Sequence, residues 1–131
     1  MYELTVKTNF AAAHSLRNYD GDCARLHGHT WVVEVSVLGE ELDEAGILID
    51  FKKLKRLIAE MIEELDHSYI NEVPYFNAHD KYNNPTAENL ARYIYINIKK
   101  ELQNLKYNVK ISKVRLWESP NASVTYREEV L

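Results

Sequence analysis

Two segments of the chain alternate apolar and polar residues, which is the period of a strand with one buried face. The first covers residues 2–7, and the second covers residues 31–37 and is rich in β-branched side chains. A third strand is predicted over residues 109–116, where a phase slip at Lys113 indicates a β-bulge. A fourth is predicted over residues 122–128.

Between the second and third of these segments the apolar residues change to helical spacing. One apolar stripe runs over residues 51–65, and Asp50 stands before it as a predicted N-cap. A second helix is predicted to begin near Pro85 and Thr86, because proline is favoured in a first turn. The chain order ββααββ predicts an α+β fold. In it, a four-stranded antiparallel sheet carries both helices on one face, which buries both stripes.

Composition narrows the class of protein. A chain of 131 residues, of which 46% are hydrophobic, predicts a single domain over residues 1–131 with a core that needs no disulfide. One cysteine is typical of a reducing compartment. The N-terminus lacks the features of a signal peptide and no apolar run spans a bilayer, so we expect a cytoplasmic protein with no membrane partner. The net charge of −4 argues against a nucleic-acid partner but permits an anionic small molecule.

Histidines cluster around the predicted strand ends. His27 and His29 flank Gly28 just before the second strand, and residues two apart in an extended segment point to the same side. His14 ends the first strand region, so an antiparallel hairpin would bring it beside them. Three imidazoles without a fourth protein ligand are typical of a catalytic zinc. Copper, nickel and iron also accept imidazole, and unrelated surface or core histidines are the alternative.

Other reactive residues are ambiguous from the pattern alone. The pattern leaves three interpretations of Cys23: a small buried side chain, a thiolate that acts as nucleophile or base, or a fourth metal ligand. In Asp66-His67 the carboxylate can orient the imidazole, but adjacent helical residues do not face each other, which favours a polar C-terminal turn. Glu118 ends a strand, where it either binds a flat amidine-like edge or faces water. Thr86 and Glu88 are ordinary residues for a helix start.

Together these segments resemble the 6-pyruvoyl-tetrahydropterin synthase family, and within it the bacterial-type 6-carboxy-5,6,7,8-tetrahydropterin synthases of queuosine biosynthesis. The matching motifs are Phe10-x-Ala12-Ala13-His14, Cys23-x-x-x-His27-Gly28-His29, Ile49-Asp50-Phe51, Leu65-Asp66-His67, Pro85-Thr86-Ala87-Glu88-Asn89 and Trp117-Glu118. Each motif is weak alone, but their order along the chain is specific. The short spacer after Cys23 resembles the carboxy-forming subgroup. Pyruvoyl-forming enzymes have a longer spacer, and a folate-linked subgroup has glutamate in place of the cysteine.

The resemblance implies a tunnelling fold (T-fold) that assembles into a homohexamer of two stacked trimers, with active sites at the subunit interfaces. It implies the following roles: Zn²⁺ ligands His14, His27 and His29; catalytic residues Cys23, Asp66 and His67; and substrate-binding residues Glu118, Thr86 and Glu88. In the family the catalytic groups meet across a subunit boundary.

The implied reaction converts 7,8-dihydroneopterin triphosphate to 6-carboxy-5,6,7,8-tetrahydropterin, with release of acetaldehyde and triphosphate. The alternatives are a 6-pyruvoyl-tetrahydropterin synthase, a sepiapterin-cleaving enzyme and a non-catalytic pterin-binding module. No basic cluster for the triphosphate stands out, and the candidate cations are Arg17, Arg25 and Lys81.

Overall fold

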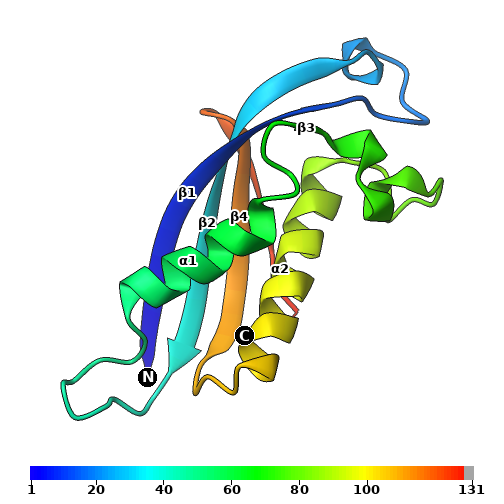
Figure 1. The fold of residues 1–131 in the computed structure, drawn as a ribbon. Helices are drawn as coiled ribbons and strands as arrows, with labels where there is room; N and C mark the ends of the chain where they lie inside the picture. The colour runs from blue at the N-terminus through cyan, green and yellow to red at the C-terminus, as the bar shows by residue number, and fades with distance from the viewer. Residues whose placement is uncertain (129–131) are drawn as a thin grey trace.

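The computed structural model describes residues 1–128, in which a five-stranded sheet carries two α-helices on one face (Figure 1). The strands lie in the order β3-β1-β2-β4-β5. Their bounds are β1 (Tyr2–His14), β2 (His27–Gly39), β3 (Ser68–Tyr69), β4 (Lys110–Ser119) and β5 (Ala122–Tyr126). The helices are α1 (Phe51–Ile62) and α2 (Ala87–Asn104), and the 3₁₀ turns are η1 (Asp22–Ala24), η2 (Ile70–Glu72) and η3 (Pro74–Asn77).

The predicted α+β class and the placement of both helices on one face are confirmed, but the predicted four-stranded antiparallel sheet is wrong. A fifth strand, β3, lies between the helices in the chain and pairs with β1 in parallel, while the other strand pairs are antiparallel. β3 has two residues, too few to show any period. It forms because the chain after α1 returns along the free edge of β1, with Ser68 opposite Ala12.

β1 and β2 form one long hairpin that extends beyond both predicted strands. Their register runs from Tyr2 opposite Gly39 to His14 opposite His27. Phe10 lies opposite Trp31 on the face that the helices cover, and their rings stack with centroids 6.1 Å apart. We call the end of the hairpin formed by residues 11–14 and 27–30 its arm. The arm has several small residues, which obscure the alternation in the sequence, so the predicted strands stop short. The arm carries His14, His27 and His29.

A bulge in β4 sets the direction of the side chains that follow it. Ser36 pairs with Lys113 and Val37 pairs with Ile111, so Ser112 is the extra residue. The bulge predicted at Lys113 therefore lies one residue earlier. Past it, Val114 and Leu116 return to the covered face and are fully buried. Glu118, two residues further along the strand, points to the same side.

Both helices begin where the sequence predicts. The Asp50 side chain accepts a hydrogen bond from the Lys52 amide at 2.8 Å, and the Thr86 hydroxyl accepts one from the Asn89 amide at 3.1 Å. α1 ends at Ile62 rather than at residue 65, because the chain turns back toward β1.

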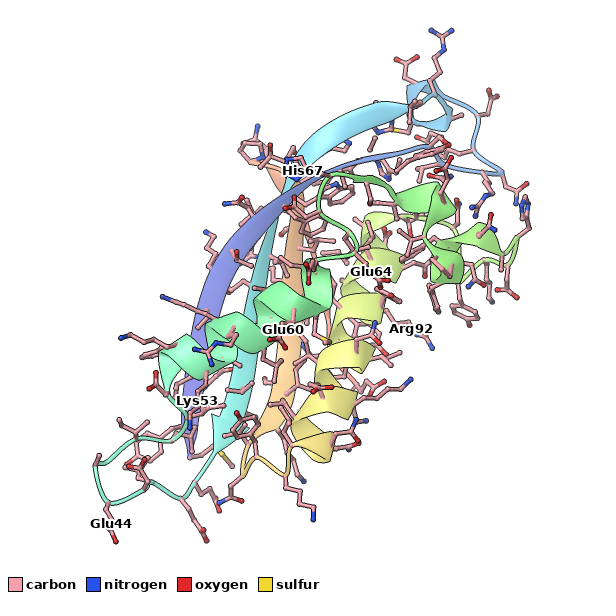
Figure 2. The ribbon with its side chains drawn as sticks, in the orientation of Figure 1. Glu44, Lys53, Glu60, Glu64, His67 and Arg92 are labelled. Atoms are coloured by element: carbon pink, nitrogen blue, oxygen red, sulfur yellow. The ribbon has the colours of Figure 1, made fainter. Side chains whose placement is uncertain are left out.

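The core lies between the sheet and the two helices. Apart from the exposed Phe51, the inward positions of α1 pack onto the sheet, while polar side chains such as Lys53 and Glu60 lie on its exposed face (Figure 2). Residues with no more than 1% exposure include Val33, Val35, Leu54, Ile58, Leu90, Ile94 and Ile98. Within residues 1–128, neither helix has the length and apolar character needed to cross a bilayer.

Candidate metal centre

Three imidazoles converge at the arm of the β1–β2 hairpin. His14 and His27 are direct cross-strand partners, and His29 lies two residues further along the same strand face. The ring centroids are 4.5 Å apart for His14 and His27, 4.8 Å for His27 and His29, and 5.2 Å for His14 and His29. Each of the three histidines offers one ring nitrogen and Glu118 offers one carboxylate oxygen, and these four atoms all lie within 4.8 Å of one another. This group can hold a metal ion.

The hydrogen bonds of two rings determine which nitrogen is free. His14 Nδ1 lies 2.7 Å from the Pro85 carbonyl oxygen, and His27 Nδ1 lies 2.6 Å from the Arg25 carbonyl oxygen. A carbonyl oxygen can only accept, so each Nδ1 carries the proton and each Nε2 keeps a lone pair. The Nε2 atoms of all three histidines are buried. That of His27 has no hydrogen-bond partner among the described residues, and those of His14 and His29 face Glu118 Oε1. Buried nitrogens that face one another fit a metal ion.

The surroundings keep His14 neutral, which is the form that binds a metal. His14 is 1% exposed, and its burial lowers the pKa of the imidazole below its ordinary value of 6.5. Trp31 packs against the cluster from the core side and is fully buried. Its ring centroid lies 5.0 Å from that of His14 and 5.2 Å from that of His29, in edge-to-face contacts. We did not predict this role, although Trp31 shares the face of His29 by strand alternation.

Glu118 completes the cluster from β4. Its Oε1 atom lies 2.9 Å from His29 Nε2 and 3.5 Å from His14 Nε2. The side chain is 32% exposed, so it forms the solvent-facing side of the group. The carboxylate can act either as a fourth metal ligand or as an anchor for a molecule bound beside the metal.

Asp66 and His67 form a hydrogen-bonded pair at the edge of β1. Asp66 Oδ1 accepts from the Ala11 amide at 3.0 Å and lies 3.0 Å from His67 Nδ1, while the His67 amide donates to the Ala11 carbonyl. The pairing that helical geometry disfavours is possible because α1 has already ended and His67 has a left-handed φ of 57°. Asp66 therefore orients the imidazole of His67, whose side chain is 83% exposed.

This pair lies at the edge of β1, and His67 is not part of the candidate metal-ligand group among residues 1–128. His67 lines a shallow hollow of about 450 Å³ together with Ala11, Ala13, Gly28 and His29. Figure 2 shows His67 beside β1. Ala13 pairs with Gly28, and the next pair is His14 with His27. Because side chains alternate along a strand, the Ala13 side chain points away from the face on which the His14 side chain lies. A single chain thus does not bring His67 to the metal cluster.

Residues 3–129 match the family model described as 6-pyruvoyl tetrahydropterin synthase. The chain belongs to this family. The 6-carboxy-5,6,7,8-tetrahydropterin synthase of Bacillus subtilis is 35% identical over 127 residues, which is 96% of this chain and 85% of that protein. The dihydroneopterin monophosphate aldolase of Pyrococcus furiosus is 37% identical over 112 residues, 86% of this chain and 85% of that protein. The 6-pyruvoyl tetrahydropterin synthase structure from Caenorhabditis elegans has a TM-score of 0.83 at 26% identity, covering 98% of this chain and 96% of that one.

The expected resemblance is thereby confirmed, and the chain is an enzyme of the lyase type. A carboxy-forming synthase and an aldolase are similar to it at nearly equal identity. Overall identity therefore does not separate these two reactions.

The remaining predicted residues lie around the cluster rather than in it. Cys23 is half-buried in η1, within the turn that joins β1 to β2, and its carbonyl accepts from the Leu16 amide at 2.9 Å. It does not belong to the group of candidate metal ligands found among residues 1–128. Thr86 caps α2, and Glu88 is exposed in the first turn of that helix.

The charge of Asp66 is expected to stabilise the fold above acidic pH. The Ala11 amide, aided by His67, holds the pKa of Asp66 below its ordinary value of 3.8. A depressed pKa adds stability that is present above the unfolded value and is lost as pH falls through the folded value. Asp66→Asn should therefore lower the melting temperature at about pH 7, and the difference should shrink as the pH falls below 3.8 and through the lower pKa of the folded state. Asp20→Asn, at an exposed position, is the control, and a difference that is constant with pH would contradict the assignment.

Proposed function

We propose that this chain is a zinc-dependent 6-carboxy-5,6,7,8-tetrahydropterin synthase that acts in the cytoplasm, early in queuosine biosynthesis. Its substrate would be 7,8-dihydroneopterin triphosphate, and its products 6-carboxy-5,6,7,8-tetrahydropterin, acetaldehyde and triphosphate. The observation that carries the proposal is the convergence of three buried Nε2 atoms beside the Glu118 carboxylate. The short spacer between Cys23 and His27 favours this subgroup, and the Bacillus subtilis relative at 35% identity is a carboxy-forming synthase.

His14, His27 and His29 would hold the zinc. Neutral imidazoles suit Zn²⁺, and three protein ligands leave a position for substrate. When bound there, zinc supplies Lewis-acid chemistry that makes loss of a proton from the substrate side chain easier. Trp31 keeps water from the inner side of the cluster, which strengthens electrostatic interactions with the ligands.

Glu118 would anchor the pterin ring, with Thr86 and Glu88 lining the same pocket. A carboxylate can accept two parallel hydrogen bonds from adjacent N–H groups on the edge of a flat ring. Because Glu118 Oε1 lies 2.9 Å from His29 Nε2, a ring bound to this carboxylate would present its side chain close to the metal ligands.

Cys23, Asp66 and His67 would move the protons. Asp66 accepts from His67 Nδ1, which leaves His67 Nε2 free to take or give a proton, and a thiolate at Cys23 would act as a second base. Since His67 lies outside the candidate ligand group of its own chain, a neighbouring subunit would complete the site. We therefore propose a homohexamer of two stacked trimers in which residues 1–131 form one domain and a neighbouring subunit contributes Asp66 and His67.

Product analysis tests the reaction directly. Zinc-loaded protein is incubated with 7,8-dihydroneopterin triphosphate, and the pterins are identified by mass, with His29→Ala as the matched control. A 6-carboxy product would support the proposal. A 6-pyruvoyl product would overturn the subgroup assignment. Turnover of dihydroneopterin monophosphate or sepiapterin instead would place the chain with the aldolase or the sepiapterin-cleaving enzymes. Binding without turnover would leave only a pterin-binding module.

Substitution of Glu118 separates its two possible roles. As a pterin anchor, Glu118→Gln should raise KM by roughly 10- to 100-fold, because a hydrogen bond to a charged group contributes about 1.5–3 kcal/mol. Zinc content should not change. The control is Glu60→Gln on the exposed face of α1 (Figure 2). Loss of zinc from Glu118→Gln would instead make Glu118 a fourth metal ligand.

A further inference from the structure

Two asparagine side chains take the place of a neighbouring strand where β1 ends. The Ser15 amide donates to Asn71 Oδ1 at 3.0 Å, and Asn71 Nδ2 donates to the Ser15 carbonyl at 2.8 Å. The Arg17 amide donates to Asn84 Oδ1 at 2.9 Å, and Asn84 Nδ2 donates to the Arg17 carbonyl at 2.9 Å. Ser15 and Arg17 are two residues apart, which is the spacing at which a strand bonds to a neighbour on one side. Each amide therefore supplies the donor and the acceptor of a missing strand.

The residues held in this way directly follow the metal-cluster residue His14. Asn71 is 9% exposed, and the two bonds to Ser15 use one donor and one acceptor of its buried amide. On its other side, His14 donates from Nδ1 to the carbonyl of Pro85, the residue after Asn84. The orientation of the His14 ring thus depends on the segment of residues 71–85, which lies 57 or more positions further along the chain.

Asn84 also braces the carbonyl that His14 uses. Its own carbonyl accepts from the Thr86 amide at 2.7 Å and from Asn89 Nδ2 at 2.9 Å. Pro85 between them is buried and has a fixed φ, so its carbonyl has little freedom to turn. By contrast, His27 uses the carbonyl of Arg25, only two residues away.

We propose that Asn71 and Asn84 are positioning residues for the metal ligand His14. They hold the backbone after His14 and, in the case of Asn84, the Pro85 carbonyl, so that His14 Nε2 already faces the cluster before a metal binds. Neither side chain belongs to the candidate metal-ligand group among the described residues. The inference rests on the proposed metal centre. Its physical basis is preorganisation, because a ligand held in its binding rotamer loses less conformational entropy when the metal binds.

Metal affinity of the folded protein tests this. Asn84→Ala and Asn71→Ala are compared with Asn97→Ala, which removes an asparagine bond to the Tyr93 carbonyl inside α2, away from the cluster. The zinc dissociation constant is measured by competition with a chromogenic chelator, and folding is checked by circular dichroism. We expect Asn84→Ala and Asn71→Ala to weaken zinc binding by about 10- to 100-fold, as outer-shell partners of metal ligands typically do. Asn97→Ala should leave it unchanged.

A double-mutant comparison shows whether the effect passes through His14. In a His14→Ala background, Asn84→Ala should not weaken the remaining zinc binding further, since the residue it positions is gone. Equal losses in both backgrounds, or an unchanged zinc dissociation constant in folded Asn84→Ala and Asn71→Ala, would overturn the inference. If Asn84→Ala does not fold, Asn84→Asp takes its place. This variant keeps the acceptor for the Arg17 amide and loses the donor to the Arg17 carbonyl, so it should bind zinc more weakly than the wild-type protein. Failure of the wild-type protein to bind zinc would instead overturn the metal centre itself.

Discussion

Replacing His29 with alanine is expected to remove the bound metal and abolish pterin conversion. Its Nε2 atom is one of the three buried imidazole nitrogens that converge beside Glu118. Complete structural zinc sites contribute about 10–16 kcal/mol, so a single ligand accounts for about 3 kcal/mol, or roughly a hundredfold or more in zinc affinity. Zinc content after dialysis and the dissociation constant measured with a competing chelator report the first effect. Product formation at saturating zinc reports the second.

His79 provides the matched control for this experiment. It lies exposed between η3 and α2, outside the histidine cluster, so His79→Ala should bind zinc and turn over substrate as the wild-type protein does. If His29→Ala retained one zinc per chain and full activity, the histidine cluster would not be the catalytic metal centre. Loss of activity with retained zinc would point to a role for His29 in the chemistry rather than in holding the metal.

Mixing two inactive variants is expected to restore activity. Cys23→Ala and His67→Ala should each lower kcat by about 10²- to 10⁴-fold, the usual contribution of a general acid or base, while zinc remains bound. Cys23 belongs to the turn that joins β1 to β2, whereas His67 lies at the edge of β1, outside the candidate metal-ligand group. If neighbouring subunits supply the two residues, a mixed assembly contains some sites in which both are intact.

The expected recovery is quantitative. Random assembly of equal amounts of the two variants leaves about one site in four with both residues intact, so activity should approach a quarter of the wild-type value. The variants are coexpressed or unfolded and refolded together, and each variant treated alone is the control. A mixture that stays as inactive as its components would place Cys23 and His67 of one chain in the same site, or show that no shared site forms. Light scattering of the same samples reports the assembly state.

Several features followed from local patterns along the chain. Asp50 and Thr86 cap the two helices as predicted, because a capping bond joins residues two or three apart. The bulge near Lys113 was visible because an extra residue shifts a period of two at once. The meeting of His14 with His27 and His29 also followed from the sequence. Strand alternation placed His27 and His29 on one face, and the antiparallel hairpin brought His14 opposite them.

Other features were decided by the tertiary structure alone. β3 is two residues long and exists only because the chain after α1 meets the edge of β1. The left-handed turn at His67 allowed Asp66 to orient its imidazole at the edge of β1. Neither arrangement has a periodic signal, because each depends on contacts between residues more than fifty positions apart.

The sequence alone therefore determined the class of fold, the helix boundaries at their N-termini, the histidine cluster and the family, since these depend on short-range periods and motif order. The tertiary structure decided the fifth strand, the bracing of His14 by Pro85, Asn71 and Asn84, and the separation of His67 from the metal ligands. The physical reason is that these contacts join side chains to distant backbone groups. Asparagine is common in any polar loop, so its presence between α1 and α2 could not indicate which backbone groups it would bind.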